Sequence, residues 1–127
     1  KLYKAGFPVL IENAGQPSTY YQDFYAQQED APGLAFNPAQ FAAAGEKPFL
    51  GVFYRGALRK RLAHCYIADG TFAGDDAWPG QGNGEVKEII SMLRCRGYEG
   101  VLTLRSSTPG FVFHFVAGAF WKLLDEM

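Results

Sequence analysis

The feature that most constrains the fold is a pair of successive strand, loop and helix patterns between residues 62 and 105. Residues 62–67 are an apolar run suited to a buried strand, and the loop over residues 69–84 contains five glycines and one proline. Apolar residues then recur at helical spacing, which predicts an amphipathic helix over residues 85–96. Polar groups follow the strands, where parallel α/β proteins place their active sites.

The rest of the chain follows the same alternation. We predict further strands over residues 7–11, 33–36 and 101–104, and further helices over residues 19–28, 39–44, 49–60 and 111–126. Strands that alternate with helices in this way imply right-handed crossovers between parallel strands. The sequence therefore predicts an α/β fold, with residues 1–127 forming a single domain of four β/α units.

Charge and hydropathy argue against two classes of partner. The chain has 12 basic and 13 acidic residues and a net charge of −1, whereas nucleic-acid binding needs a concentrated basic face. The four basic side chains between residues 55 and 61 fall at the end of a predicted helix, where they complement its dipole. The longest apolar tract, residues 111–121, contains His114 and is shorter than the ~20 residues that cross a bilayer. We expect neither nucleic acid nor a membrane as partner.

Cysteine usage bears on the compartment. Cys65 falls in a predicted strand and Cys95 in a predicted helix, at a spacing typical of neither a metal site nor a redox motif. We expect two buried free thiols in a reducing cytoplasm. The first residue is Lys1 rather than Met, and we expect the chain to be a processed product, an expressed fragment or the later part of a longer polypeptide.

Several motifs resemble one family. L-A-H-x-x-x-x-D at residues 62–69, P-G-x-G at 79–82, and a helix ending in G-Y-x-G at 97–100 resemble the last units of the sugar phosphate isomerase/epimerase family. V-L-I-E-N at residues 9–13 and G-L-A-F-N-P-A-Q-F at 33–41 resemble its fifth and sixth strands. The resemblance covers nearly the whole chain but only half of the family's xylose-isomerase-like barrel. It implies the C-terminal half of a (β/α)₈ TIM barrel, strands five to eight.

The resemblance also implies a site, which this sequence alters. Family enzymes hold a divalent metal with Glu, Asp, His and Glu at the ends of these strands, and two carboxylates move a proton beside the polarised carbonyl. Glu12 matches the first ligand. Asn37 and Gln40 stand where the sixth strand usually has D-P-x-H, and His64 and Tyr66 stand where the seventh has H-x-H.

The sharpest departure is Arg105, which stands where the family has its terminal Glu. A protonated guanidinium offers no lone pair to a cation, and replacing an anion by a cation shifts the local charge by two units. No acidic residue lies between Arg105 and Asp125, so the loss does not depend on the exact alignment. We therefore predict a degenerate metal site and no cofactor.

Each candidate residue has two interpretations. Glu12 is either a surviving base or an anion paired with Arg105, and we favour the pair, which would lower the pKa of Glu12. His64 is either an acid/base group or a hydrogen-bonded structural residue. Asp69 either orients a loop or a substrate hydroxyl, or makes an ordinary Asp-Gly turn. Trp78 either covers a sugar face or packs against the core.

Two functions follow from these residues. The first is binding of a sugar or polyol, or a structural role, with substrate-binding candidates Asn37, Gln40, Tyr66, Asp69 and Trp78. The alternative is a metal-independent isomerase, epimerase or lyase, with catalytic candidates Glu12 as base, Arg105 as electrophile and His64 or Tyr66 as acid.

An isolated half-barrel would also expose an apolar inner face and two unpaired strand edges. We therefore expect self-association or pairing with a missing N-terminal half.

Overall fold

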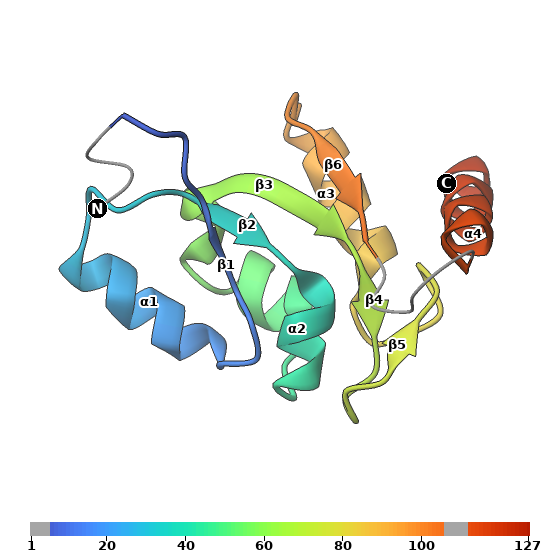
Figure 1. The fold of residues 1–127 in the computed structure, drawn as a ribbon, viewed down its shortest axis with the longest axis horizontal. Helices are drawn as coiled ribbons and strands as arrows, with labels where there is room; N and C mark the ends of the chain where they lie inside the picture. Colours follow the sequence, from blue (N-terminus) through green and yellow to red (C-terminus); the bar gives the residue numbers. More distant parts are fainter. Residues whose placement is uncertain (1–5, 106–111) are drawn as a thin grey trace.

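The computed structural model describes residues 6–105 and 112–127, without the side chains of Val112 and Phe113. A parallel sheet lies at its centre, with strands β1 (Ile11–Glu12), β2 (Leu34–Phe36), β3 (Leu62–Ile67) and β6 (Leu102–Leu104) in the order β1-β2-β3-β6 (Figure 1). The α-helices are α1 (Ser18–Gln27), α2 (Pro38–Ala43), α3 (Val86–Cys95) and α4 (Val112–Glu126). The predicted α/β class with parallel strands is confirmed. Position 111, where the last helix was predicted to begin, lies outside the described residues.

The main core lies on one face of the sheet. Leu34 and Phe36 of β2 and Cys65 of β3 are fully buried there. The helical segments contribute the other buried members, which are Tyr21, Tyr25, Phe41, Val52, Phe53, Leu58, Ile89 and Leu93. Because side chains alternate along a strand, Ala35, His64, Tyr66 and Thr103 belong to the opposite face.

That opposite face was predicted to be apolar, and it is mixed. Among the described residues it carries His64, Tyr66 and Thr103 on its middle and edge strands, with Leu10 47% exposed just before β1 and Val101 69% exposed just before β6. The helix-covered face therefore holds the apolar core, and the open face carries both polar and exposed apolar side chains.

The predicted single helix over residues 49–60 is wrong. The structure has a π-helix, η2 (Pro48–Tyr54), followed by a separate 3₁₀ turn, η3 (Leu58–Arg61). Gly56 lies between them in a close contact, because a Cβ atom there would stand 2.4 Å from the Val52 carbonyl oxygen. Glu85, at φ +51°, holds the start of η2, since its Oε1 accepts hydrogen bonds from the backbone N–H groups of Phe49 and Leu50 at 3.0 and 3.2 Å.

Two smaller expectations also differ from the structure. The loop over residues 69–84 contains a short antiparallel hairpin, β4 (Asp69–Gly70) and β5 (Asp76–Ala77). Both cysteines are free, but only Cys65 is buried, whereas Cys95 is exposed. Burial raises the pKa of the Cys65 thiol to about 12.

The end of α3 and the position of α4 follow from specific contacts. Gly97, at φ +66°, ends α3 as predicted, with hydrogen bonds from the Gly97 and Tyr98 N–H groups to the carbonyls of Arg94 and Leu93. α4 packs through Leu123 on a smaller core of Ile67, Val86 and Ile90. None of the helices in the described residues is long and apolar enough to cross a membrane.

Candidate functional site

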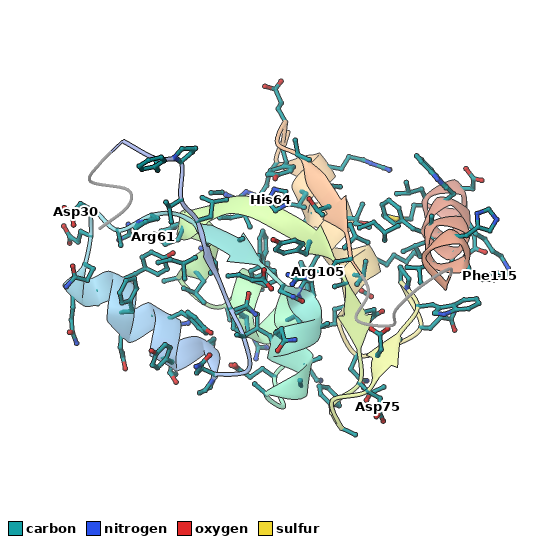
Figure 2. All side chains as sticks on the ribbon, viewed as in Figure 1. Asp30, Arg61, His64, Asp75, Arg105 and Phe115 are labelled. Atoms are coloured by element: carbon teal, nitrogen blue, oxygen red, sulfur yellow. The ribbon has the colours of Figure 1, made fainter. Side chains whose placement is uncertain are left out.

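The candidate site lies at the carboxyl ends of the four parallel strands, on the open face. Glu12 ends β1 and Arg105 follows β6, which are the two edge strands of the sheet. Their side chains nevertheless meet, because Arg105 Nη1 lies 2.5 Å from Glu12 Oε2. The outer strands of a four-stranded sheet are about 14 Å apart at the usual spacing, so both side chains lean inward over β2 and β3. Figure 2 shows Arg105 in front of the middle of the sheet.

The predicted pairing of Glu12 with Arg105 is therefore confirmed, and its accessibility matters. The Arg105 side chain is 49% exposed and the Glu12 side chain 31% exposed. Both oxygens of Glu12 accept a hydrogen bond from Arg105 Nη1. The ion pair is thus open to solvent and to a ligand on one side.

Asn37, directly after β2, supports Glu12. Its Nδ2 donates to Glu12 Oε2 at 3.2 Å, while its Oδ1 accepts the Gln40 backbone N–H at 3.4 Å and so caps α2. The backbone of Asn37 is fixed by Asn13, whose Nδ2 donates to the Asn37 carbonyl at 2.9 Å and whose Oδ1 accepts the Asn37 N–H at 2.8 Å. The end of β1 is therefore tied to the end of β2 through both Glu12 and Asn13.

Tyr66 lies beneath the guanidinium group. The Arg105 Cζ atom stands 5.0 Å from the centre of the Tyr66 ring, within the range of a cation–π contact. Partial burial and the nearby Glu12 carboxylate raise the pKa of Tyr66. Tyr66 is therefore a neutral aromatic surface at neutral pH, with a hydroxyl group that can donate a hydrogen bond.

Opposing effects act on the Glu12 carboxylate. Burial raises its pKa, but hydrogen bonds from Arg105 and Asn37 and the positive charge of Arg105 outweigh this effect, so the pKa of Glu12 is lowered. The same hydrogen bond raises the pKa of Arg105. Both groups are charged at neutral pH, and Glu12 is a weaker base than an ordinary glutamate, as the sequence predicted for the paired state.

His64 lies on the same face, one step back from the strand ends. A ring nitrogen lies 2.7 Å from Thr103 Oγ1 of β6, and the ring meets Tyr66 edge to face at 5.1 Å. These contacts match the interpretation of His64 as a hydrogen-bonded residue that joins β3 to β6.

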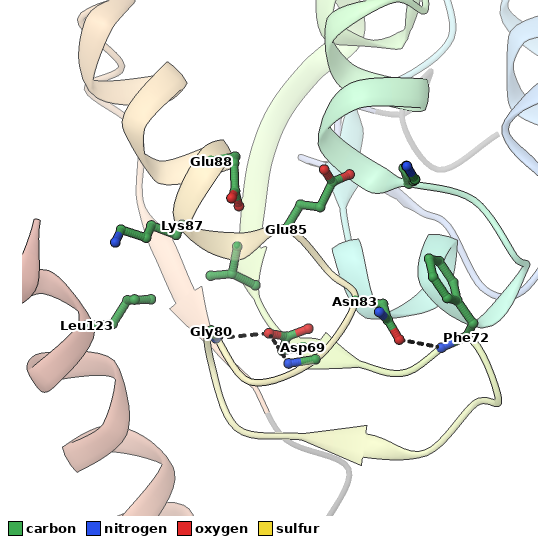
Figure 3. Close-up of a pocket in the computed structure, with 11 residues that line it drawn as sticks. Asp69, Phe72, Gly80, Asn83, Glu85, Lys87, Glu88 and Leu123 are labelled. Carbon is green, nitrogen blue, oxygen red and sulfur yellow. Dashed lines mark hydrogen bonds between the residues drawn. The ribbon is translucent and has the colours of Figure 1, made fainter.

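Asp69 was a substrate-binding candidate, but its carboxylate is buried inside the glycine-rich loop. Its side-chain oxygens accept four backbone N–H groups, from Gly70, Gly80, Gly82 and Gly84, at 2.7 to 3.1 Å. Figure 3 shows the bond from Gly80. Asp69 is only 2% exposed. It therefore orients the loop, which was one of the roles predicted for it, and its carboxylate is enclosed rather than open to a substrate.

The remaining candidates lie apart from the ion pair. Trp78 stacks on Phe115 of α4, and Figure 2 shows Phe115 at one end of the molecule, well away from Arg105. The backbone N–H of Gln40 donates a hydrogen bond to Asn37, the N-cap residue of α2, and the Gln40 side chain lies near Gly15. The structure thus brings Glu12, Asn37, Tyr66 and Arg105 together.

The four strand-end residues do not fit a divalent metal. Arg105 Nη1 occupies the space beside both Glu12 oxygens, and Asn37 and Tyr66 could offer a metal only uncharged oxygen atoms. In the described part of the chain, no three His, Cys, Asp or Glu side chains are grouped so that they could hold a metal ion. A bound cation would have to displace the guanidinium group and would meet one carboxylate.

Asn13 and Thr103 were missed in the sequence analysis. Asn13 is fully buried, and its position directly after the first strand is a signal of a residue that ties strand ends together. Thr103 stands next to Tyr66 in the register of β3 and β6, but the sequence alone does not give that register.

Comparisons with models of protein families, with curated proteins and with solved structures found no match. The structure itself defines an α/β protein whose four parallel strands end in a polar, solvent-open cluster.

Proposed function

We propose that the chain is the C-terminal half of a sugar-isomerase-like barrel, with a degenerate metal site, and that its strand-end cluster binds a sugar or polyol. The observation that carries this proposal is the meeting of Glu12, Asn37, Tyr66 and Arg105 on the open face. Parallel α/β sheets bind ligands at the carboxyl ends of their strands. The resemblance of the sequence to the isomerase family supports the ligand class.

The chemistry of the cluster suits a ligand with neighbouring hydroxyl groups. Glu12 accepts hydrogen bonds from hydroxyl groups, and the exposed guanidinium of Arg105 donates to hydroxyl or carbonyl oxygens. The ring of Tyr66 offers an apolar surface for the C–H groups of a sugar ring. Such a site combines a few oriented polar groups with an aromatic wall, as small-molecule sites do.

The alternative, a metal-independent isomerase, epimerase or lyase, has weaker support. It requires Glu12 as base, whereas the contact with Arg105 lowers the pKa of Glu12 and so makes it a weaker base. His64, a candidate acid, is engaged with Thr103. The ion pair favours binding over proton transfer.

Titration with a panel of aldoses, ketoses and polyols, followed by calorimetry and by NMR of the Arg105 side chain, tests the proposal. We expect at least one member to bind saturably and Arg105→Gln to weaken it about tenfold or more, because a charge-assisted hydrogen bond contributes about 1.5–3 kcal/mol. Arg94→Gln, an exposed arginine on α3, is the matched control and should bind normally. Equal binding by Arg105→Gln would contradict the assignment of the site.

Two further measurements separate the degenerate site from the alternatives. Stoichiometric, tightly bound Mn, Mg, Co or Zn in the purified protein would overturn the degenerate-site proposal. Turnover of a ketose that vanishes in Glu12→Gln would favour the isomerase over the binding protein.

We also propose that a second sheet covers the open face, supplied by an N-terminal half or by another copy, in a cytoplasmic protein. The exposed side chains of Leu10 and Val101 flank the two edge strands, where unpaired backbone groups favour pairing with further strands. Sedimentation at micromolar concentration tests this. Self-association is expected for the isolated chain, and a strictly monomeric mass would count against pairing between copies.

A further inference from the structure

A second hollow lies far from the strand-end cluster, between the glycine-rich loop and α4. It has a volume of about 580 Å³ and is lined by Trp78, Pro79 and Gln81 of the loop, Lys87 of α3, and Phe115 and Lys122 of α4, among others. Figure 2 places Phe115 at one end of the molecule, away from His64 and Arg105, which lie over the sheet near the middle of the view. We name this hollow the α4 groove. A ligand bound there would not touch Glu12 or Arg105.

Two parallel aromatic rings mark the α4 groove. The rings of Trp78 and Phe115 are inclined by only 8°, with centroids 6.4 Å apart. Trp78 is 47% exposed and Phe115 53% exposed, although both are large apolar side chains. Gly118 and Ala119 also line the α4 groove, and their small size keeps the surface of α4 low beside Phe115. The groove thus offers flat, accessible aromatic surface to a ring of similar shape.

The charges around the α4 groove are mainly positive. Lys87, Lys122 and His114 contribute basic side chains, and Glu126 contributes the one carboxylate of the lining. With His114 neutral, the lining carries two positive charges and one negative charge, whereas the whole chain has a net charge of −1. An anionic group is therefore favoured at the rim beside the aromatic rings.

The loop wall of the α4 groove is held in place by the buried Asp69 carboxylate. Gly80 donates its N–H to Asp69 Oδ2 at 2.9 Å and approaches α4 so closely that a Cβ atom there would stand 3.2 Å from Leu123 Cδ1. Leu123 in turn packs on the smaller core. A neighbouring hollow of about 310 Å³ shares Gly80, Lys87 and Leu123 with the α4 groove, so the two are adjoining (Figure 3).

We propose that the α4 groove binds a small aromatic molecule that carries an anionic group, a phosphate or a carboxylate. The ring stacks on the aromatic surface of Trp78 and Phe115, and the anionic group pairs with Lys122 and Lys87. The ligand needs both its ring and its anionic group. A neutral aromatic molecule would not pair with the lysines, and an anion without a ring would not cover the aromatic side chains.

Intrinsic fluorescence gives a direct assay for this ligand class. The chain has two tryptophans, so Trp121→Phe leaves Trp78 as the sole tryptophan. Phenyl phosphate and benzoate are the probes, and inorganic phosphate and benzyl alcohol are their ring-free and charge-free counterparts. We expect saturable quenching by phenyl phosphate or benzoate, at concentrations about tenfold lower than for either counterpart, since stacking and charge pairing each contribute about 1 kcal/mol or more.

Variants place the ligand in the α4 groove, with calorimetry as the readout. Phe115→Ala should weaken binding of the better probe about tenfold by removing one aromatic surface. Lys122→Gln, which changes no packed side chain, should weaken it about threefold, and exposed Lys60→Gln on η3 is the matched control with unchanged affinity.

Several outcomes would overturn the proposal. If neither phenyl phosphate nor benzoate quenches the fluorescence saturably, the site is rejected. Equal affinity for benzyl alcohol rejects the anionic component, and equal affinity for inorganic phosphate rejects the aromatic one. Weakening by Lys60→Gln as large as that by Lys122→Gln would show general charge attraction rather than a site.

Discussion

Two carboxylates stand at strand ends on the same edge of the sheet and have opposite environments. Glu12 is partly exposed and is held by the side chains of Arg105 and Asn37. Asp69, just after β3, is 2% exposed and is held by four backbone N–H groups of its own loop. Glu12 can exchange its partners for a ligand, whereas Asp69 cannot without unfolding the loop.

The difference shows that position at a strand end does not by itself make a binding residue. An accessible carboxylate with side-chain partners keeps lone pairs open to a ligand, and a carboxylate enclosed by amides acts as a structural anchor. In this molecule the anchor also has an indirect effect, because it fixes the Gly80 wall of the α4 groove.

The largest expected effect comes from removing the anchor. Asp69→Ala leaves buried N–H donors of the loop without an acceptor, so we expect the free energy of unfolding to fall by about 3 kcal/mol or more. Asp69→Asn, which keeps the shape and one oxygen acceptor, should have a smaller effect. Urea denaturation measures both, with the exposed Asp75→Ala as control, expected within about 0.5 kcal/mol of wild type. A small effect of Asp69→Ala would remove the contrast between the two carboxylates.

The next effect tests how tightly the loop encloses Asp69. A Cβ atom at Gly84 would stand 2.6 Å from Asp69 Oδ1, so Gly84→Ala must push the carboxylate away from its donors. We expect a loss of about 1–3 kcal/mol, as for other insertions into packed sites. In Gly51→Ala the added Cβ makes only ordinary contact, with Lys47 Cβ at 3.9 Å, so this control should be neutral or more stable. Equal effects of the two substitutions would show that the enclosure is loose.

The fold was predictable to the extent that periodicity encodes it. The apolar run at residues 62–67 and the helical spacing in residues 85–96 gave β3 and α3 nearly as the structure has them. The π-helix η2 was not predictable, because its start depends on hydrogen bonds from Phe49 and Leu50 to Glu85, more than thirty positions away. Short-range patterns do not contain such contacts.

For the site, too, the sequence predicted one contact and missed another. The pairing of Glu12 with Arg105 followed from the topology, since the carboxyl ends of parallel strands lie at one edge of the sheet. The enclosure of Asp69 did not follow, because its partners are backbone N–H groups, which every residue except proline has. The glycines at positions 80, 82 and 84 were visible in the sequence. The reason why glycine stands there is steric, and it becomes clear only from the fold.

A double-mutant cycle measures the coupling free energy between Glu12 and Arg105, which can be compared with the stabilisation by the buried Asp69 carboxylate. Glu12→Gln, Arg105→Gln and the double variant should give a coupling free energy of only about 0.2–1 kcal/mol, because both side chains remain solvated. High salt, about 1 M, should reduce the coupling further. The effect of Arg105→Gln on ligand binding should therefore exceed its effect on stability. A coupling above about 3 kcal/mol would mean that the pair is a structural element like Asp69.

The smallest expected effect is the pH dependence that Glu12 adds to stability. Its pKa in the folded protein is lowered from the ordinary value of 4.5, so the folded state binds the proton less readily than the unfolded state. The stabilisation by ionised Glu12 is therefore fully present above the unfolded pKa and is lost as the pH falls through the folded pKa.

Urea denaturation of wild type and Glu12→Gln between about pH 6 and pH 3 measures this term. The stability difference between them should shrink by up to about 0.5 kcal/mol, all of it below about pH 4.5, since solvent screens the pair. Glu99→Gln, at an exposed position, is the control and should follow wild type over the same range. A difference that grows as the pH falls would mean that the pKa of Glu12 is raised, and Glu12 would then have the protonation behaviour of a general base rather than of a fixed anion.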